Sequence, residues 1–353
     1  MTDGMPTARL GAFAVSRERA AVEGPLAGYH HETYVLPLPS RDRSSAERWK
    51  AREPRAGIKW FDRGCLHSEE PLLRVLAGRV TGLPGLLETN GVASRQFIEG
   101  STLGRVAPAP APVPEALFRQ LVGFFGQLAR IDPAALAVAR RCVPADRPAD
   151  GDGDGFLGQL IDFVEQHVYR TASDEFEQLF HSLGIGPGVF RSLRAHVSGL
   201  RGRPFRLLHG DLHRENLIVD ADGRLWVIDW ELAMVGDPLY DLATHLHLMR
   251  YPAWQAGRMA REWSRAVGPV SSDGWQEDLV RIMHFKRAQS VFTDVIRAAR
   301  DLGTAPDTAR VTGAASRLHR VLTAAAEPLG LAAVPAPRDM AEALDHWRPL
   351  ARS

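Results

Sequence analysis

The residues best suited to chemistry lie in one stretch, LLHGDLHRENLIVDADGRLWVIDWE, which runs from Leu207 to Glu231. Asn216 follows Asp211 by five residues, and Asp229 follows Asn216 by thirteen. Two oxygen ligands on rigid backbone suit a hard divalent cation such as Mg²⁺, which keeps positions open for phosphate oxygens. A further carboxylate can accept the proton of an attacking hydroxyl, and phosphoryl transfer needs little beyond such positioning and charge neutralisation. The spacing therefore favours metal-assisted phosphoryl transfer.

Three short strands are predicted to position these groups. FRLL, residues 205–208, is an apolar strand that ends just before His209. LIV and RLWVID are two further strands, joined by DADG, whose Asp-Gly pair signals a hairpin. Asp211 then lies in the loop after the first strand and Asn216 closes that loop. The hairpin returns Asp229 to the side of the same loop.

The chain divides by pattern into three parts. Residues 1–25 form a loosely held lead-in, and residues 26–100 show strands around one helix, a small β-rich lobe. That helix is predicted from Leu72, Leu73, Leu76 and Val80, with Ser68 as its N-cap. Residues 101–353 open with a Pro/Ala-rich connector and become mainly helical, so we expect an α+β fold with two lobes.

Composition sets the broad class. The 353 residues are 45% hydrophobic and 24% charged, with a net charge of +1, which favours a soluble globular protein with no nucleic-acid partner. Two cysteines cannot form a disulfide framework, and no apolar run is long enough to span a membrane. We therefore expect a cytoplasmic protein without a membrane partner; its oligomeric state stays open.

Three segments between Leu207 and Ala243 resemble the aminoglycoside phosphotransferase family: HGDLHRENLIV, VIDWE and GDPLYDLA. This family is the small-molecule branch of the protein-kinase-like fold and is related to choline and homoserine kinases. The resemblance implies a two-lobed protein-kinase-like fold, with a small β-rich N-lobe and a larger, mainly helical C-lobe. It also implies transfer of the γ-phosphate of ATP, or of GTP, to a hydroxyl of a small molecule, with Mg²⁺ as cofactor.

The resemblance assigns roles in the C-lobe. Asp211 would be the catalytic base, and Asn216 and Asp229 would hold Mg²⁺. His209 would brace the loop through backbone hydrogen bonds. Glu231 would lie near the metal, and Asp241 would anchor the loop from the following helix.

The resemblance further implies a nucleotide site in the N-lobe, with a lysine for the phosphates and a helix glutamate to hold that lysine. Only three lysines occur in the chain, and two of them precede residue 100: Lys50, favoured by its strand position, and Lys59. Glu69 fits the helix position, with Glu70 as the alternative. The segment GPLAGYHHETYV lacks a full glycine-rich motif. Backbone recognition of the base is expected at Gln96, Phe97, Ile98 and Glu99.

Two other classes are weighed against this interpretation. A pseudokinase or nucleotide-binding module would have lost Asp211, Asn216, Asp229 or the lysine, and none is lost. A metal-dependent hydrolase could use the H-x-D-x-H pattern of HGDLH, but it would leave Asn216 and Asp229 without a role.

The acceptor, an antibiotic or a metabolite, stays open. We expect the C-terminal helices, about 255–353, to hold it, where carboxylates could bind a polycation. Such residues are ordinary helix surface in most proteins. The candidates are Asp273, Glu277, Asp278, Glu342 and Asp345.

Overall fold

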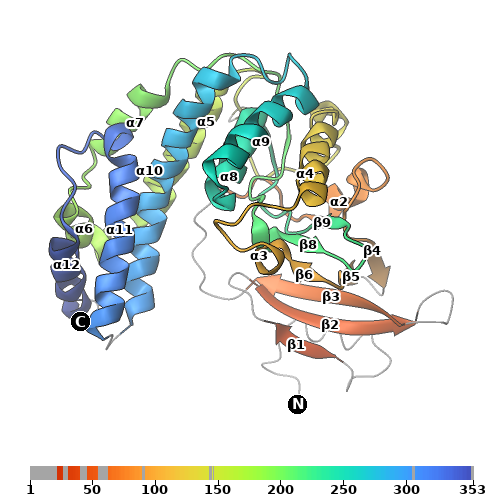
Figure 1. The fold of residues 1–353 in the computed structure, drawn as a ribbon, viewed down its shortest axis with the longest axis horizontal. Coiled ribbons are helices and arrows are strands. Elements are labelled where there is room, and N and C mark those ends of the chain that lie inside the picture. Colours follow the sequence, from red (N-terminus) through yellow and green to blue (C-terminus); the bar gives the residue numbers. More distant parts are fainter. Residues whose placement is uncertain are drawn as a thin grey trace.

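A five-stranded antiparallel sheet lies at one end of the molecule and helices make up most of the rest (Figure 1). The computed structural model describes residues 22–26, 31–39, 46–54, 63–89, 92–142, 145, 147–303 and 307–350. The two-lobed α+β architecture expected from the sequence is therefore present. Lys59, most of the expected lead-in and residues 27–30 of the segment GPLAGYHHETYV lie outside the described residues.

The large sheet has the strand order β1-β2-β3-β5-β4. Its strands are β1 (Glu23–Leu26), β2 (His31–Pro39), β3 (Ala46–Pro54), β4 (Leu86–Thr89) and β5 (Val92–Gln96). Trp49 and Ala51 of β3 are buried in a small apolar cluster on one face. Because side chains alternate along a strand, Lys50 and Arg52 point to the opposite face. β1 begins at Glu23, before the boundary that the sequence placed at residue 26.

The N-lobe helix α2 spans Glu70–Leu76 and buries Leu72, Leu73 and Leu76. Ser68 is not its N-cap, which corrects the expectation: the N-cap position is Glu69, and no side chain caps the helix there. The helix thus begins one residue later than the capping pattern predicted.

Two small sheets follow the N-lobe sheet. One has the order β6-β8-β9 and the other pairs β10 with β7. The predicted hairpin is formed by β8 and β9, whose turn is closed by Asp220, since its carboxylate accepts hydrogen bonds from the backbone of Asp222 and Arg224. The bounds are β6 (Ser101–Thr102), β7 (Arg206–Leu208), β8 (Leu217–Val219), β9 (Leu225–Val227) and β10 (Met234–Gly236).

Helices build the remainder of the C-lobe and enclose one apolar core. In Figure 1, α7, α10, α11 and α12 lie together, away from the five-stranded sheet, while α4, α8 and α9 lie nearer to it. Within the described residues, no helix is both long and apolar enough to span a membrane. The helices are α3 (Leu103–Val106), α4 (Glu115–Leu128), α5 (Gly153–Phe163), α6 (Ser173–Ser182), α7 (Val189–Val197), α8 (Pro238–Met249), α9 (Ala253–Val267), α10 (Trp275–Leu302), α11 (Thr308–Leu329) and α12 (Pro337–Leu350).

Candidate active site

The loop after β7 is held from two sides. The backbone N–H groups of His209 and Gly210 donate to the two carboxylate oxygens of Asp241 on α8, at 3.0 and 2.9 Å. The buried His209 ring places Nε2 3.1 Å from the carbonyl oxygen of Ile228. Gly210 has φ 82°, and a Cβ there would lie 2.5 Å from the carbonyl oxygen of Leu232, so the tight turn requires glycine. The loop is therefore fixed between the hairpin and α8.

Burial shifts the pKa values of the two residues that hold this loop, His209 and Asp241. It lowers the pKa of His209 and raises the pKa of Asp241, because each charged form loses hydration inside the protein. His209 is accordingly neutral at physiological pH, which suits a ring that braces backbone.

Asp211 and Asn216 meet across this loop. Asn216 Nδ2 donates to the Asp211 carbonyl oxygen at 2.9 Å and to Asp211 Oδ2 at 3.0 Å. Because both amide hydrogens are on Nδ2, the oxygen Oδ1 is the atom of Asn216 that can bind a cation. The Asp211 side chain is 30% exposed, so a substrate hydroxyl could reach it.

His213 is a neighbour of Asp211 to which the sequence interpretation did not assign a role. Its Nε2 lies 3.3 Å from Asp211 Oδ2. Burial opposes protonation of His213, but the hydrogen bond that its ring donates to Asp211, together with the nearby Asp229 carboxylate, raises its pKa. Both carboxylates thus lie close enough to act on one ring. The second histidine of HGDLH was the available signal for this residue.

Asp229 follows β9 in a left-handed backbone conformation, with φ 67°. Residues other than glycine seldom adopt this conformation, and aspartate is among those that tolerate it. Its Oδ1 accepts a hydrogen bond of 2.8 Å from Arg52 Nη1, which crosses from the N-lobe sheet. Although burial opposes it, the Arg52 guanidinium lowers the pKa of Asp229, so this carboxylate is ionised at neutral pH.

Glu69 links the two lobes, but not through the lysine expected from the resemblance. Its Oε1 lies 2.5 Å from Arg52 Nη2 and 2.6 Å from Arg95 Nη1. Its Oε2 accepts a hydrogen bond of 2.7 Å from the backbone N–H of Trp230, next to Asp229. Two arginines therefore occupy the place expected for Lys50.

Glu70, the alternative to Glu69, pairs with Arg95 and is more exposed than Glu69. Its Oε1 lies 2.5 Å from Arg95 Nη2, and the side chain is 18% exposed against 3% for Glu69. The buried carboxylate that touches both Arg52 and the C-lobe backbone is thus Glu69.

Lys50 lies on the same face of β3 as Arg52, and the same neighbouring charges affect its pKa. Burial, together with Arg52 and Arg95, lowers the pKa of Lys50 to about 8, while Glu69 and Asp229 act in the opposite direction. A third cation is therefore held at this face, with an ammonium that titrates just above neutral pH.

The segment from Gln96 to Glu99 joins the five-stranded sheet to β6. Gln96 Oε1 accepts a hydrogen bond of 3.1 Å from the backbone of Gly85. The backbone N–H of Phe97 donates to the Arg48 carbonyl oxygen at 2.8 Å, and the Arg48 side chain lies over the Phe97 ring and binds Glu99. Ile98 is half-buried within the same connection.

Glu231 lies at the edge of this cluster, two residues after Asp229. Its Oε2 is 3.5 Å from His31 Nε2 and 3.7 Å from Arg52 Nη2. It therefore neutralises the N-lobe cations alongside Glu69 and Asp229.

The acidic residues of the C-terminal helices do not gather into one site. Asp278 is buried and binds Arg203 Nη1 at 2.7 Å, so it belongs to a structural ion pair. Asp273 and Glu277 are exposed, and Glu342 pairs with Arg338 one turn away on α12. These contacts favour helix surface and structural pairing over a carboxylate-lined pocket.

The two lobes, the braced loop and the cationic face of β3 define a protein-kinase-like fold of the type that transfers phosphate to small molecules. The sequence pattern of the phosphotransferase enzyme family (APH) matches residues 30–279, well over half of the chain, and the chain belongs to this family.

Solved structures with the same fold have low sequence identity to the chain. The macrolide 2′-phosphotransferase of Brachybacterium faecium is 16% identical, with a TM-score of 0.51 over 88% of this chain and 97% of its own. The choline kinase of Streptococcus pneumoniae is 17% identical, with a TM-score of 0.50 over 87% and 94%. The ethanolamine kinase of Plasmodium vivax is 14% identical, with a TM-score of 0.50 over 86% and 82%.

Proposed function

We propose that the protein is an ATP-dependent O-phosphotransferase that moves the γ-phosphate to a hydroxyl of a small molecule, an antibiotic or a metabolite. One observation carries the proposal: the Asp211–Asn216 pair and Asp229 lie on one braced loop and hairpin, opposite the Lys50 and Arg52 cations of β3. Anionic groups for a metal and a proton thus face cationic groups for phosphates, as phosphoryl transfer requires.

Asp211 is the proposed base. Its carboxylate is fixed by Asn216 and His213 on one side and remains partly exposed on the other. A hydroxyl within hydrogen-bond reach would be oriented by Asp211 and would pass its proton there as the bond to phosphorus forms.

The donor set for a metal consists of Asn216 Oδ1 and the Asp229 carboxylate. Both are hard oxygen ligands, and the Asp229 carboxylate is ionised at neutral pH, which fits Mg²⁺. When bound, Mg²⁺ would neutralise charge on the phosphate oxygens. Arg52 already binds Asp229 Oδ1, so this guanidinium has to shift or share the carboxylate when the metal enters.

The nucleotide is proposed to lie under β3 and against the connection Gln96–Glu99. Backbone groups there would recognise the base, which leaves ATP and GTP both possible donors. Lys50 would bind phosphate oxygens, and its pKa would rise because these anionic oxygens would offset the effect of the neighbouring arginines.

The hydrolase alternative loses support from the histidines. Both ring nitrogens of His209 face backbone groups, Nε2 toward the Ile228 carbonyl oxygen and Nδ1 toward the Asp211 N–H. His209 therefore cannot join His213 as a metal ligand without breaking the loop.

A panel of hydroxylated acceptors, scored for ADP release with Mg²⁺ and ATP, tests the proposed function. Macrolides, choline and ethanolamine are the first members, since similar folds carry those names. We expect acceptor-dependent ADP release that requires Mg²⁺ and is absent in Asp211→Asn. Nucleotide binding without turnover on any acceptor would favour a nucleotide-binding module instead.

A further inference from the structure

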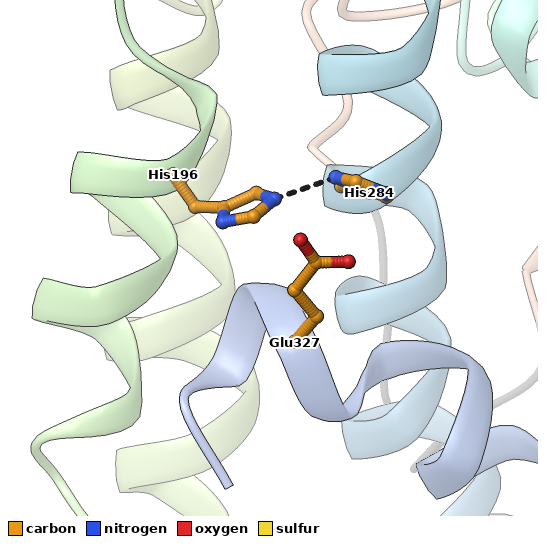
Figure 2. A group of neighbouring side chains, drawn as sticks. All are labelled: His196, His284 and Glu327. Carbon is orange, nitrogen blue, oxygen red and sulfur yellow. Dashed lines mark hydrogen bonds between the residues drawn. The ribbon is translucent and has the colours of Figure 1, made fainter.

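Two histidines and a glutamate from three different helices meet in the C-lobe bundle. His196 is in the last turn of α7, His284 is on α10 and Glu327 is near the end of α11. His196 Nε2 lies 2.7 Å from His284 Nδ1, and the carboxylate of Glu327 lies below the two rings (Figure 2). One donor atom from each residue lies within 4.8 Å of the other two. None of the three belongs to the phosphotransfer site.

The backbone near this group is rigidly placed. Gly330 ends α11 with φ 64°, and its N–H donates to the Glu327 carbonyl oxygen at 3.0 Å. A Cβ at Gly330 would lie 2.5 Å from Ser192 Oγ on α7, so the end of α11 packs closely against the helix that carries His196. Glu327 is consequently held near the histidines by helix packing, while its exposed side chain can adjust.

The chemistry of the group matches a transition metal. Two imidazole nitrogens and a carboxylate oxygen form a known zinc ligand set, with a fourth position for water. In tetrahedral geometry with bonds of about 2.0–2.1 Å, donor atoms are separated by roughly 3.3 Å. The nitrogens of His196 and His284 would separate by about 0.6 Å from their 2.7 Å contact, and the Glu327 carboxylate would move inward.

The two ring nitrogens that face each other, His196 Nε2 and His284 Nδ1, can both serve as donors to a metal. A neutral ring can offer Nδ1 to a metal and keep its proton on Nε2.

We propose that His196, His284 and Glu327 form a zinc site that fastens α7, α10 and α11 together. The site is independent of phosphotransfer, because its ligands lie on helices away from the catalytic loop (Figure 1). Its two imidazole nitrogens distinguish it from the all-oxygen ligands of Asn216 and Asp229, which suit Mg²⁺.

Zinc titration of the chelator-treated full chain, in the presence of excess Mg²⁺ and a competing dye, tests the site. We expect one tightly bound zinc per chain. His196→Ala and His284→Ala should weaken binding by about 100-fold or more, and Glu327→Gln by about 10-fold, since each removes a direct ligand. His181→Ala is the matched control, because His181 is likewise in the last turn of a helix, α6, and is exposed.

Thermal melting provides a second measurement. Zinc should raise the melting temperature of the wild type and of His181→Ala by about 5 °C at saturating metal, but not that of the histidine variants. Cobalt in place of zinc should give the intense visible bands of a four-coordinate site in the wild type, which decides the matter if a variant fails to fold. Equal zinc affinity in wild type and His284→Ala, or a six-coordinate cobalt spectrum, would overturn the proposal.

Discussion

Arg52 is expected to stabilise the protein far more than an ordinary arginine. Its side chain is only 10% exposed and bridges Glu69, 3% exposed, and Asp229. Removing one partner of a buried pair costs about 3–5 kcal/mol, because the other charge is left buried. Arg95 still binds Glu69 after the change, so we expect Arg52→Ala to lower the free energy of unfolding by about 2–4 kcal/mol.

Urea unfolding followed by fluorescence measures this loss, and Arg74→Ala is the matched control. Arg74 pairs with Glu88 in the same lobe, but the two side chains are 58% and 63% exposed, and such pairs contribute about 0–1 kcal/mol. The refuting result is an Arg52→Ala protein as stable as Arg74→Ala. It would mean that the Arg52 bridge is not formed in solution.

Three further changes test the site. Lys50 has a pKa of about 8, against 10.5 for an ordinary lysine, so the unfolded chain holds more protons between pH 8 and 10.5. The free energy of unfolding should therefore rise across that window by up to about 3 kcal/mol relative to Lys50→Met. At pH 7 the Lys50→Met protein should be the more stable of the two. Parallel pH profiles of the two proteins would contradict this expectation. Asp241→Asn should cost about 1–3 kcal/mol in urea unfolding and should slow turnover, because an amide group meets two backbone N–H donors; an unchanged midpoint would argue against the anchor. Asp229→Ala should weaken Mg²⁺-dependent nucleotide binding measured by calorimetry, and an unchanged Mg²⁺ dependence would remove Asp229 from the metal site.

The C-lobe motif could be predicted because its signals are local. The Asp-Gly turn fixes the hairpin, and the hairpin places Asp229 beside the loop of Asp211 and Asn216, all within about twenty residues. Interactions over such short separations depend mainly on turn type and strand register.

The N-lobe pairing could not be predicted in the same way. Lys50 and Arg52 are two residues apart on one strand, so side-chain alternation gives both the same face, and only tertiary packing selects Arg52 as the partner of Glu69. The sequence pattern predicts a lysine at this position, but an arginine makes the same contact with a planar donor pair.

No sequence motif indicated that His196, His284 and Glu327 lie together in the C-lobe. His196 and His284 are 88 residues apart and come together only through helix packing. Metal motifs are recognised when their ligands share one helix or loop at fixed spacing, and these ligands lie on three helices.

Phosphate transfer by wild type and Asp211→Asn, measured side by side, tests the central claim most directly. With ATP labelled at the γ-phosphate, Mg²⁺ and an acceptor identified from the panel, we expect label in the acceptor and a loss of roughly 10²–10⁴-fold in the variant. ATP binding and the melting temperature should change little, because asparagine keeps the shape of the side chain and its neighbours Asn216 and His213. Transfer by Asp211→Asn at the wild-type rate would contradict the assignment of Asp211 as the base.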